Sequence, residues 1–316
     1  MVIYSRAPLR LAFAGGGTDT DVFASLYGGA VVSVTIARYV RVRMEPGVRK
    51  YTSYPLAQSD VSFLGKLARR FPPASLELMV DVPPQSGLGA SGAIGVAALG
   101  ALNTMNPDEP MSLKEIADLA HRIEFEELGV PGGRQDQVAA AWGGLNYLEF
   151  GNGRVNVTPV EASHDTLLNL ENSLVLVFVS PRTTSSGKVM ANEIARIRAD
   201  DAVTIQALKR QKELANEARR WLRRGDLGAL GAILEGSWEA KKKQAPLTTS
   251  PFIDEVYEAG KKAGALGGKI SGAGGGGYFY FLAPDRVGPV GEAMIKLGLK
   301  PETVNFQMGG LKVWRS

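Results

Sequence analysis

The sequence predicts an α+β fold of two lobes, and three observations support it. Strand-like and helix-like segments alternate over residues 1–152. From residue 174 a second half begins with a strand, continues with a run of helix candidates and closes on further strands. A chain of 316 residues with 45% hydrophobic content buries a large core, which at this length favours two lobes. We expect the lobes to span residues 1–160 and 161–316, with no repeat or low-complexity linker between them.

The elements of the first half follow from apolar periodicity. β-branched content or alternation of apolar and polar residues predicts strands over residues 31–44, 76–82 and 144–150. Residues 93–102 are rich in alanine, glycine and leucine, which predicts a buried helix. Residues 112–128 predict an amphipathic helix, because Ser112 is a good N-cap and Glu115, three residues later, completes a capping box.

The second half is predicted to be mainly helical between strands. An apolar run over residues 174–179 predicts its first strand. Helices are predicted over residues 185–198, 202–224, 226–244 and 251–264, the last opened by Pro251 and closed by Gly264. The final strands are predicted over residues 278–282 and 304–307, with residues 312–315 continuing that edge.

The most informative motif is the glycine-rich stretch of residues 83–93, which joins the strand at 76–82 to the helix at 93–102. Glycines let a backbone approach phosphate closely, and the free N–H groups and dipole of a helix start favour an anion. The predicted ATP-binding residues are Pro84, Ser86, Gly87, Leu88, Gly89, Ala90, Ser91 and Gly92. The alternative is a glycine- and alanine-rich connection made only for tight packing. The stretch is neither a Walker A sequence nor a dinucleotide fingerprint.

Two further glycine-rich elements lie beside apolar strands. Residues 6–19 run a strand into Gly-Gly-Gly-Thr-Asp, and residues 267–277 precede the strand at 278–282. In order and spacing these three motifs resemble those of the GHMP kinase superfamily, and the likeness covers essentially the whole chain. Residues 14–19, 131–137 and 264–269 look most like the D-glycero-D-manno-heptose 7-phosphate kinase branch. The glycines at 15–17 replace bulkier polar residues of the galactokinase motif, which makes galactose a less suitable acceptor.

The resemblance implies a fold, an activity and a substrate. The first lobe would resemble domain 2 of ribosomal protein S5, and the second would be ferredoxin-like. The activity would be ATP-dependent phosphorylation of a sugar or sugar phosphate, foremost D-glycero-D-manno-heptose 7-phosphate at its anomeric (C1) hydroxyl. The alternatives are another sugar kinase of the fucose or galactose type, an isoprenoid-pathway kinase, or a catalytically silent nucleotide- or sugar-binding regulator.

The resemblance also assigns the catalytic residues. Asp136 takes the position of the catalytic aspartate that orients or deprotonates the acceptor hydroxyl, a role suited to phosphoryl transfer. From its sequence context alone, a carboxylate beside Gly132 and Gly133 is equally well explained as a turn former or helix cap. Arg10 takes the position of the basic residue that reaches the acceptor and stabilises charge.

A magnesium ion is expected with ATP. In the family, a glutamate on the helix at 112–128 and a serine of the glycine-rich loop hold Mg²⁺, which points to Glu124 and Ser91, with Glu127 as the second choice. Mg²⁺ needs few protein oxygens when phosphates supply the rest. The alternative for Glu124 is an exposed acidic helix face. Ala90 and Gly92 stand where many relatives have serine, so fewer hydroxyls surround the phosphates.

Acceptor binding is predicted for residues of the first and third glycine-rich motifs and for two arginines outside them. Asp19 matches an aspartate that hydrogen-bonds sugar hydroxyls in sugar-kinase relatives. The phosphate of a phosphorylated acceptor needs fixed cations, and arginine suits bidentate phosphate contacts better than lysine, which makes Arg182 and Arg134 the candidates. The alternative for Arg182 is a solvent-facing side chain beside a plain helix cap at Ser185. The full set of predicted acceptor residues is Gly17, Thr18, Asp19, Arg134, Arg182, Gly272, Gly274 and Gly275.

Composition excludes several other functions. There are no cysteines, which excludes disulfides and thiolate metal sites, and two histidines are too few for a histidine-based metal centre. A net charge of +4 at this length suits anionic small substrates better than nucleic acid. No stretch of 18 or more apolar residues, signal-like start or Gly-x-Ser-x-Gly elbow occurs. We therefore expect a cytoplasmic enzyme without membrane or nucleic-acid partners, as a monomer or homodimer.

Overall fold

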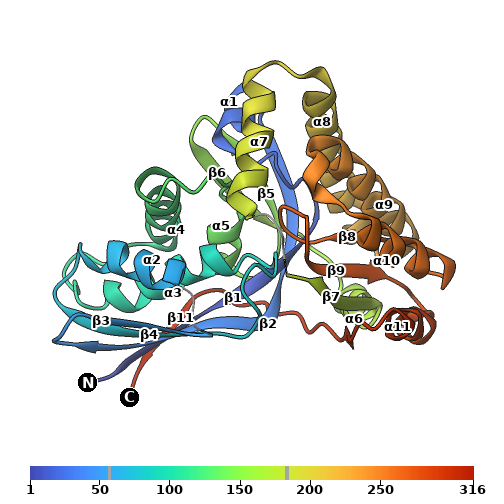
Figure 1. Ribbon diagram of the computed structural model, residues 1–316. Coiled ribbons are helices and arrows are strands. Elements are labelled where there is room, and N and C mark those ends of the chain that lie inside the picture. Colours follow the sequence, from blue (N-terminus) through green and yellow to red (C-terminus); the bar gives the residue numbers. More distant parts are fainter. Residues whose placement is uncertain (56–57, 182–184) are drawn as a thin grey trace.

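A computed structural model, which describes residues 1–55, 58–181 and 185–316, shows two lobes that are each built on one sheet (Figure 1). Within these ranges one sheet has seven strands, in the order β11-β1-β2-β4-β3 with β5 and β6 added from β2, and the other has four, in the order β10-β7-β9-β8. The predicted two-lobed α+β class is confirmed. The first sheet comprises β1 (Ile3–Ala14), β2 (Gly29–Pro46), β3 (Lys50–Tyr54), β4 (Ala74–Val80), β5 (Leu145–Gly151), β6 (Arg154–Pro159) and β11 (Lys312–Arg315). The second comprises β7 (Leu174–Ser180), β8 (Gly267–Ile270), β9 (Gly277–Leu282) and β10 (Pro301–Glu302).

Helices cover one face of the first sheet and surround the second. In Figure 1, α2, α3, α4 and α5 lie above the first sheet, while α8, α9 and α10 lie beside the strands of the second. The helices of the first lobe are α1 (Asp21–Tyr27), α2 (Gln58–Ala68), α3 (Ala90–Asn103), α4 (Leu113–Arg122), a π-helical turn (Ile123–Glu127) and α5 (Gln135–Trp142). The remaining helices are α6 (His164–Asn172), α7 (Ser186–Arg198), α8 (Ala202–Arg224), α9 (Leu227–Gln244), a 3-10 turn (Pro246–Thr248), α10 (Pro251–Lys262) and α11 (Val287–Lys296).

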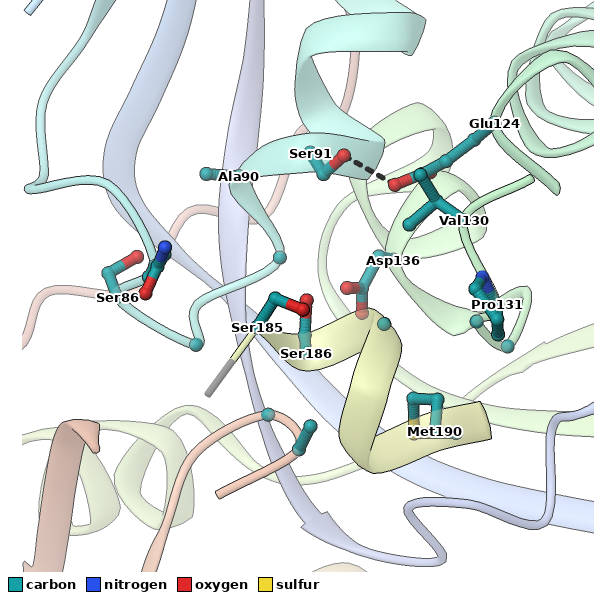
Figure 2. Close-up of a pocket in the computed structure, with 18 of the residues that line it drawn as sticks. Ser86, Ala90, Ser91, Glu124, Val130, Pro131, Asp136, Ser185, Ser186 and Met190 are labelled. Carbon is teal, nitrogen blue, oxygen red and sulfur yellow. Dashed lines mark hydrogen bonds between the residues drawn. The ribbon is translucent and has the colours of Figure 1, made fainter. Parts of the chain in front are cut away.

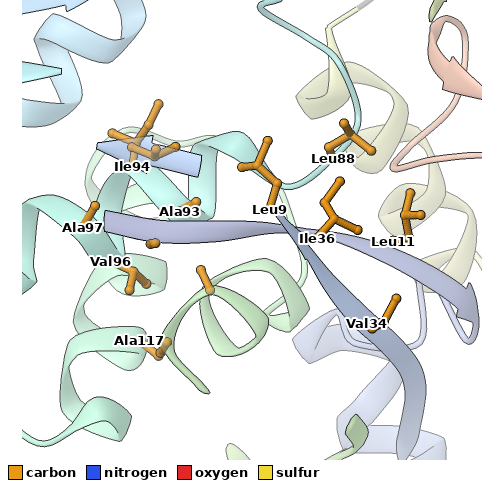
Figure 3. Packing of buried hydrophobic residues seen from close by; sticks show 14 of the residues in the cluster. Leu9, Leu11, Val34, Ile36, Leu88, Ala93, Ile94, Val96, Ala97 and Ala117 are labelled. Carbon is orange, nitrogen blue, oxygen red and sulfur yellow. The ribbon is translucent and has the colours of Figure 1, made fainter. Parts of the chain in front are cut away.

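Helix α3 is the centre of the first lobe, as its composition predicts. Its residues Ala93, Ile94 and Ala97 are buried against β1 and β2 (Figure 3). Small residues are needed here, because a Cβ added at Gly95 would lie 2.8 Å from the Ala120 Cβ of α4. The burial of residues 92–102 fixes the position of α3. It thereby fixes the end of the loop of residues 83–89, which we call the phosphate loop after its predicted ligand.

The helix predicted over residues 112–128 is present but changes type. The capping box of Ser112 and Glu115 is formed, so the predicted start is confirmed. After Arg122 the chain continues as the π-helical turn, which contains Glu124. Such turns insert an extra residue into the helical repeat and rotate the side chains that follow.

The C-terminal tail differs from the prediction in two places. Residues 304–307 form only an isolated bridge, between Phe306 and Ile36, in place of a strand. Residues Lys312–Arg315 are a strand, but one that pairs antiparallel with β1 at the edge of the first sheet. The C-terminal tail passes close to the end of α5, and this approach depends on glycine, since a Cβ on Gly143 would lie 2.2 Å from the Gly310 nitrogen. Both chain ends therefore meet on the first lobe (Figure 1).

Candidate active site

A cavity of about 920 Å³ is lined by residues of both lobes. Its volume lies in the range of small-molecule sites. The first lobe contributes residues of β1, α2, β4, the loop before α3 with the first turns of α3, and the segment from the end of α4 to the start of α5. The second lobe contributes residues of α7, α9, β8 and the loop after β8. Figure 2 shows Ser91, Glu124 and Asp136 on one side of this space and Ser185 and Ser186, at the start of α7, on the other.

The loop before α3 has the backbone geometry that phosphate binding requires. Gly87 and Gly89 adopt left-handed backbone angles, φ +83° and +81°, which glycine adopts without strain. Gly89 is the N-cap of α3 and has no side chain to cap the helix, so the first N–H groups are left for an anion. Of the predicted residues, those lining the cavity are Pro84, Ser86, Gly87, Gly89, Ala90 and Ser91.

Leu88 and Gly92 have other positions in this loop. The Leu88 side chain is fully buried in the core. Gly92 faces α5, where an added Cβ would lie 2.7 Å from the Asp136 Cβ and 2.8 Å from the Gln137 nitrogen. Glycine at 92 therefore lets the phosphate loop and the helix carrying Asp136 approach each other.

Asp136 and Arg10 form an ion pair that lines the cavity. The Arg10 Nε–H donates to Asp136 Oδ1 at 2.8 Å, and Arg10 Nη2 lies 2.6 Å from the same oxygen. Asp136 lies in the first turn of α5. The Arg10 side chain is 5% exposed and that of Asp136 28%, so the carboxylate keeps access to the cavity.

Arg10 also joins the phosphate loop to the third glycine-rich segment. Its Nη1 donates to the Gly87 carbonyl at 2.8 Å and to the Ser271 hydroxyl at 3.3 Å. Ser271 in turn donates to the Gly87 carbonyl at 2.9 Å. Sequence reasoning did not identify Ser271, although it lies inside the quoted motif. One guanidinium thus holds the phosphate loop, Asp136 and the second lobe in register.

Glu124 and Ser91 lie together, as their assignment to one site requires. The Ser91 hydroxyl donates to Glu124 Oε1, and Gln137 donates to Glu124 Oε2 at 2.8 Å (Figure 2). Burial raises the pKa of Glu124 above its usual range. Glu127 instead pairs with Arg70. In the part of the chain that the structure describes, no three acidic, histidine or cysteine side chains form a metal cluster. A cation here would therefore take Ser91, Glu124 and ligand oxygens.

Asp19 connects the first glycine-rich motif to α5. Its Oδ1 accepts from the Gly17 backbone N–H at 3.1 Å and from Gln135 Nε2 at 3.0 Å, and its Oδ2 accepts from the Gln135 backbone N–H at 3.0 Å. Burial raises its pKa. Thr18 is fully buried and bonds to the Gly15 carbonyl at 2.7 Å. Gly17 and Asp19 line the cavity.

The other predicted acceptor residues are distributed differently. Arg134 donates to both oxygens of Asp21, at 2.8 and 3.1 Å. His121 and then Arg134 lower the pKa of that carboxyl. Gly272 lines the cavity. Gly274 and Gly275 pack against the 3-10 turn, where a Cβ on Gly274 would lie 2.7 Å from Thr248. Arg182 lies outside the described residues.

Three charged cavity residues that come from α7, α9 and β8 were missed by sequence reasoning. Glu193 of α7, Lys241 of α9 and Lys269 of β8 line the cavity and are nearly buried. We call them the second wall, and Arg10, Ser91, Glu124 and Asp136 the first wall. Lys269 Nζ donates to the Ser237 hydroxyl at 2.8 Å, and burial puts its pKa well below the usual value. Only Lys269 lies in one of the glycine-rich motifs. Nothing in the sequence around Glu193 and Lys241 distinguishes them from the other charged residues of their helices.

Two family comparisons agree with this geometry. Residues 58–144 match the GHMP kinases N terminal domain, and residues 213–298 match the GHMP kinases C terminal domain. Among characterised proteins, a D-glycero-alpha-D-manno-heptose 7-phosphate kinase of Campylobacter jejuni is 32% identical over 340 aligned positions, which cover 99% of each chain. A mevalonate kinase of Thermococcus gammatolerans is 27% identical, over 76% of this chain and 68% of the relative.

Solved structures give the same result for the whole chain. A D-glycero-D-manno-heptose 1-phosphate kinase of Bacteroides thetaiotaomicron superposes with a TM-score of 0.80 at 28% identity, covering 99% of both chains. A Lactococcus lactis galactokinase in complex with galactose superposes with a TM-score of 0.77 at 19% identity, over 98% of this chain and 95% of that one, which shows a shared fold. No helix among the described residues is long and apolar enough to cross a membrane.

Proposed function

The chain belongs to the GHMP kinases, and from that premise we propose that it phosphorylates D-glycero-D-manno-heptose 7-phosphate at its anomeric C1 hydroxyl. It is an ATP-dependent phosphotransferase that uses an alcohol group as acceptor. The observation that supports the mechanism is the Arg10–Asp136 pair, which lines the same cavity as the phosphate loop and the second wall. The heptose phosphate is supported by the relative that matches along its full length.

Asp136 is assigned to the acceptor hydroxyl. Both Arg10 contacts go to Oδ1, which leaves Oδ2 for the proton of the C1 hydroxyl. As the C1 hydroxyl oxygen of the acceptor bonds to the γ-phosphorus of ATP, its proton passes to Asp136. The bond from that phosphorus to the β,γ-bridging oxygen breaks, and ADP leaves. Arg10 holds the carboxylate in place and offsets negative charge near the transferred group, so positioning and electrostatics supply most of the catalysis.

ATP is assigned to the loop side of the cavity. The N–H groups at the start of α3 would face its phosphates, and apolar side chains beyond them, Phe63, Val80 and Ile94, would face its base. Ser91 and Glu124 would hold Mg²⁺, which when bound neutralises phosphate charge and orients the phosphate oxygens. The half-buried Glu124 carboxyl, which accepts from a hydroxyl and an amide, fits such a ligand, because a cation would favour its charged form.

The acceptor is assigned to the space between Asp136, Asp19, Gly17 and Gly272. All of the groups assigned here come from one chain, so both a monomer and a homodimer satisfy the proposal. We place the reaction in the cytoplasm, where ATP is available.

The experiment is an ATP-consumption assay on a panel of acceptors. The panel contains D-glycero-D-manno-heptose 7-phosphate, hexose 6-phosphates, free mannose, fucose and galactose, and mevalonate. The heptose 7-phosphate is expected to give the highest kcat/KM, with phosphorus NMR showing a new phosphate at C1. A free sugar or mevalonate as the best acceptor would remove the heptose phosphate assignment.

A further inference from the structure

Glu193 is a buried carboxylate, and the described residues around it do not supply hydrogen-bond donors to both of its oxygens. It lies on α7, is 3% exposed and lines the cavity. Its Oε1 is buried and accepts no hydrogen bond from any residue that the structure describes. A buried acceptor without a donor destabilises the protein, so a glutamate at this position is best satisfied by a donor from outside the protein.

Gly17 of the first motif makes room for this carboxylate. A Cβ at residue 17 would lie 2.8 Å from Glu193 Oε1 and 3.3 Å from Oε2. Gly17 also has φ +95°, so a larger residue would be strained there as well as displacing the carboxylate. The space beside Gly17 is therefore occupied by a carboxylate from α7 and not by a side chain of residue 17.

The charges around Glu193 come from three elements. Lys241 of α9 and Arg196 of α7 favour its charged form, while burial and Asp19 of the first motif oppose it. Burial dominates and raises the pKa of Glu193 to about 7. Near neutral pH, a ligand that donates hydrogen bonds to Glu193 would therefore stabilise the charged form of this carboxyl.

Asp19 has fewer free lone pairs with which to accept a hydrogen bond from a ligand than Glu193 has. A carboxylate offers about four lone-pair positions, and the two Asp19 oxygens already accept three N–H groups. Those bonds fix the first motif against α5. A hydroxyl-rich ligand in the cavity therefore finds a freer acceptor in Glu193.

We infer that Glu193 is a specificity-determining residue that accepts hydrogen bonds from hydroxyl groups of the acceptor, away from the hydroxyl that is phosphorylated. The inference rests on the proposed function, because it requires a polyhydroxylated acceptor in this cavity. Sugars supply O–H donors in the number and size that the site accommodates. Within the described residues no third metal-ligating side chain joins Glu193 and Asp19, so the same geometry does not make a cation cluster.

The test compares Glu193→Gln and Glu193→Ala with Glu235→Gln as the matched control. Glu235 also lies on a second-lobe helix, but it bonds to Tyr257 and Lys261 and is not part of the cavity lining. With the best acceptor of the panel, Glu193→Ala should raise the acceptor KM about tenfold or more. Glu193→Gln should raise it less, because its amide oxygen still accepts. The KM for ATP should stay within twofold, and Glu235→Gln should match the unmodified enzyme.

Monodeoxy analogues of that acceptor separate recognition from a structural role. Removing the hydroxyl that meets Glu193 should weaken binding to the unmodified enzyme about tenfold, but should change little further in Glu193→Ala, as a double-mutant cycle requires. An unchanged acceptor KM in a folded Glu193→Ala, or equal losses for acceptor and ATP with additive deoxy effects, would overturn the inference. Failure of the proposed function is seen separately, since the panel is run on the unmodified enzyme.

Discussion

The two walls of the cavity differ in how completely their polar groups are paired. On the first wall, Arg10 binds Asp136 through two nitrogens, and Glu124 accepts from Ser91 and Gln137. On the second wall, Glu193 keeps one buried oxygen without a donor among the described residues. A wall that is paired in advance keeps its geometry for the chemical step, whereas a wall completed by ligand selects the ligand. Variants of the first wall should therefore lower turnover, and variants of the second wall should alter acceptor binding.

Asp136→Asn should produce the largest effect. The amide cannot take up the proton of the acceptor hydroxyl and loses the charge that faces Arg10, so kcat should fall by roughly 10²–10⁴. Steady-state kinetics with ATP and the best acceptor measure this fall. Calorimetry should show ATP affinity retained, because the phosphate loop is unaltered. Turnover close to that of the unmodified enzyme would show that Arg10 and desolvation activate the hydroxyl without a base.

Glu124→Gln should produce a smaller effect on the same wall. Replacing a charged oxygen ligand by an amide should raise the Mg²⁺ concentration needed for half-maximal activity about tenfold. The control is Glu127→Gln, because the Glu127 carboxylate of the unmodified protein pairs with Arg70. Activity is titrated with Mg²⁺ at fixed ATP and pH 8. Equal Mg²⁺ requirements for Glu124→Gln and the unmodified enzyme would exclude Glu124 as a ligand.

The first wall was more predictable than the second because its groups lie in or beside local motifs. The loop at 83–92 and Asp136 are recognisable in the sequence, since glycines and a helix start impose local geometry. The choice between Glu124 and Glu127 was not predictable: the π-helical turn shifts the helical repeat there, and no residue pattern announces it. Ionisable side chains of α7 and α9 look like ordinary helix-surface charges until tertiary packing buries them.

The tail and Arg134 show the same dependence on tertiary contacts. Residues 312–315 were predicted as a strand, but their partner, β1, lies about three hundred residues away in sequence. Arg134 has the chemistry to bind phosphate, yet the structure places Asp21 against it at bidentate distance. Side-chain type restricts what a residue can bind, whereas the partner depends on packing between distant segments.

Glu193→Gln should also change the free energy of unfolding, which is a separate effect from any change in turnover. Because the pKa of Glu193 in the folded protein is about 7, above the ordinary 4.5, its contribution to stability is fully present below pH 4.5 and is lost as pH rises through 7. Glutamine does not titrate, so in the absence of ligand the variant should gain on the order of 3 kcal/mol relative to the unmodified protein between pH 4.5 and pH 8. Urea denaturation at pH 5 and pH 8 measures the difference. Glu235→Gln should show the opposite sign, because Lys261 lowers the pKa of Glu235. Saturating acceptor should reduce the stability advantage of Glu193→Gln at pH 8, because hydroxyl donors then stabilise the carboxylate of the unmodified protein. An equal advantage at both pH values would contradict the raised pKa of Glu193. An advantage at pH 8 that acceptor leaves unchanged would contradict the view that the ligand completes the second wall.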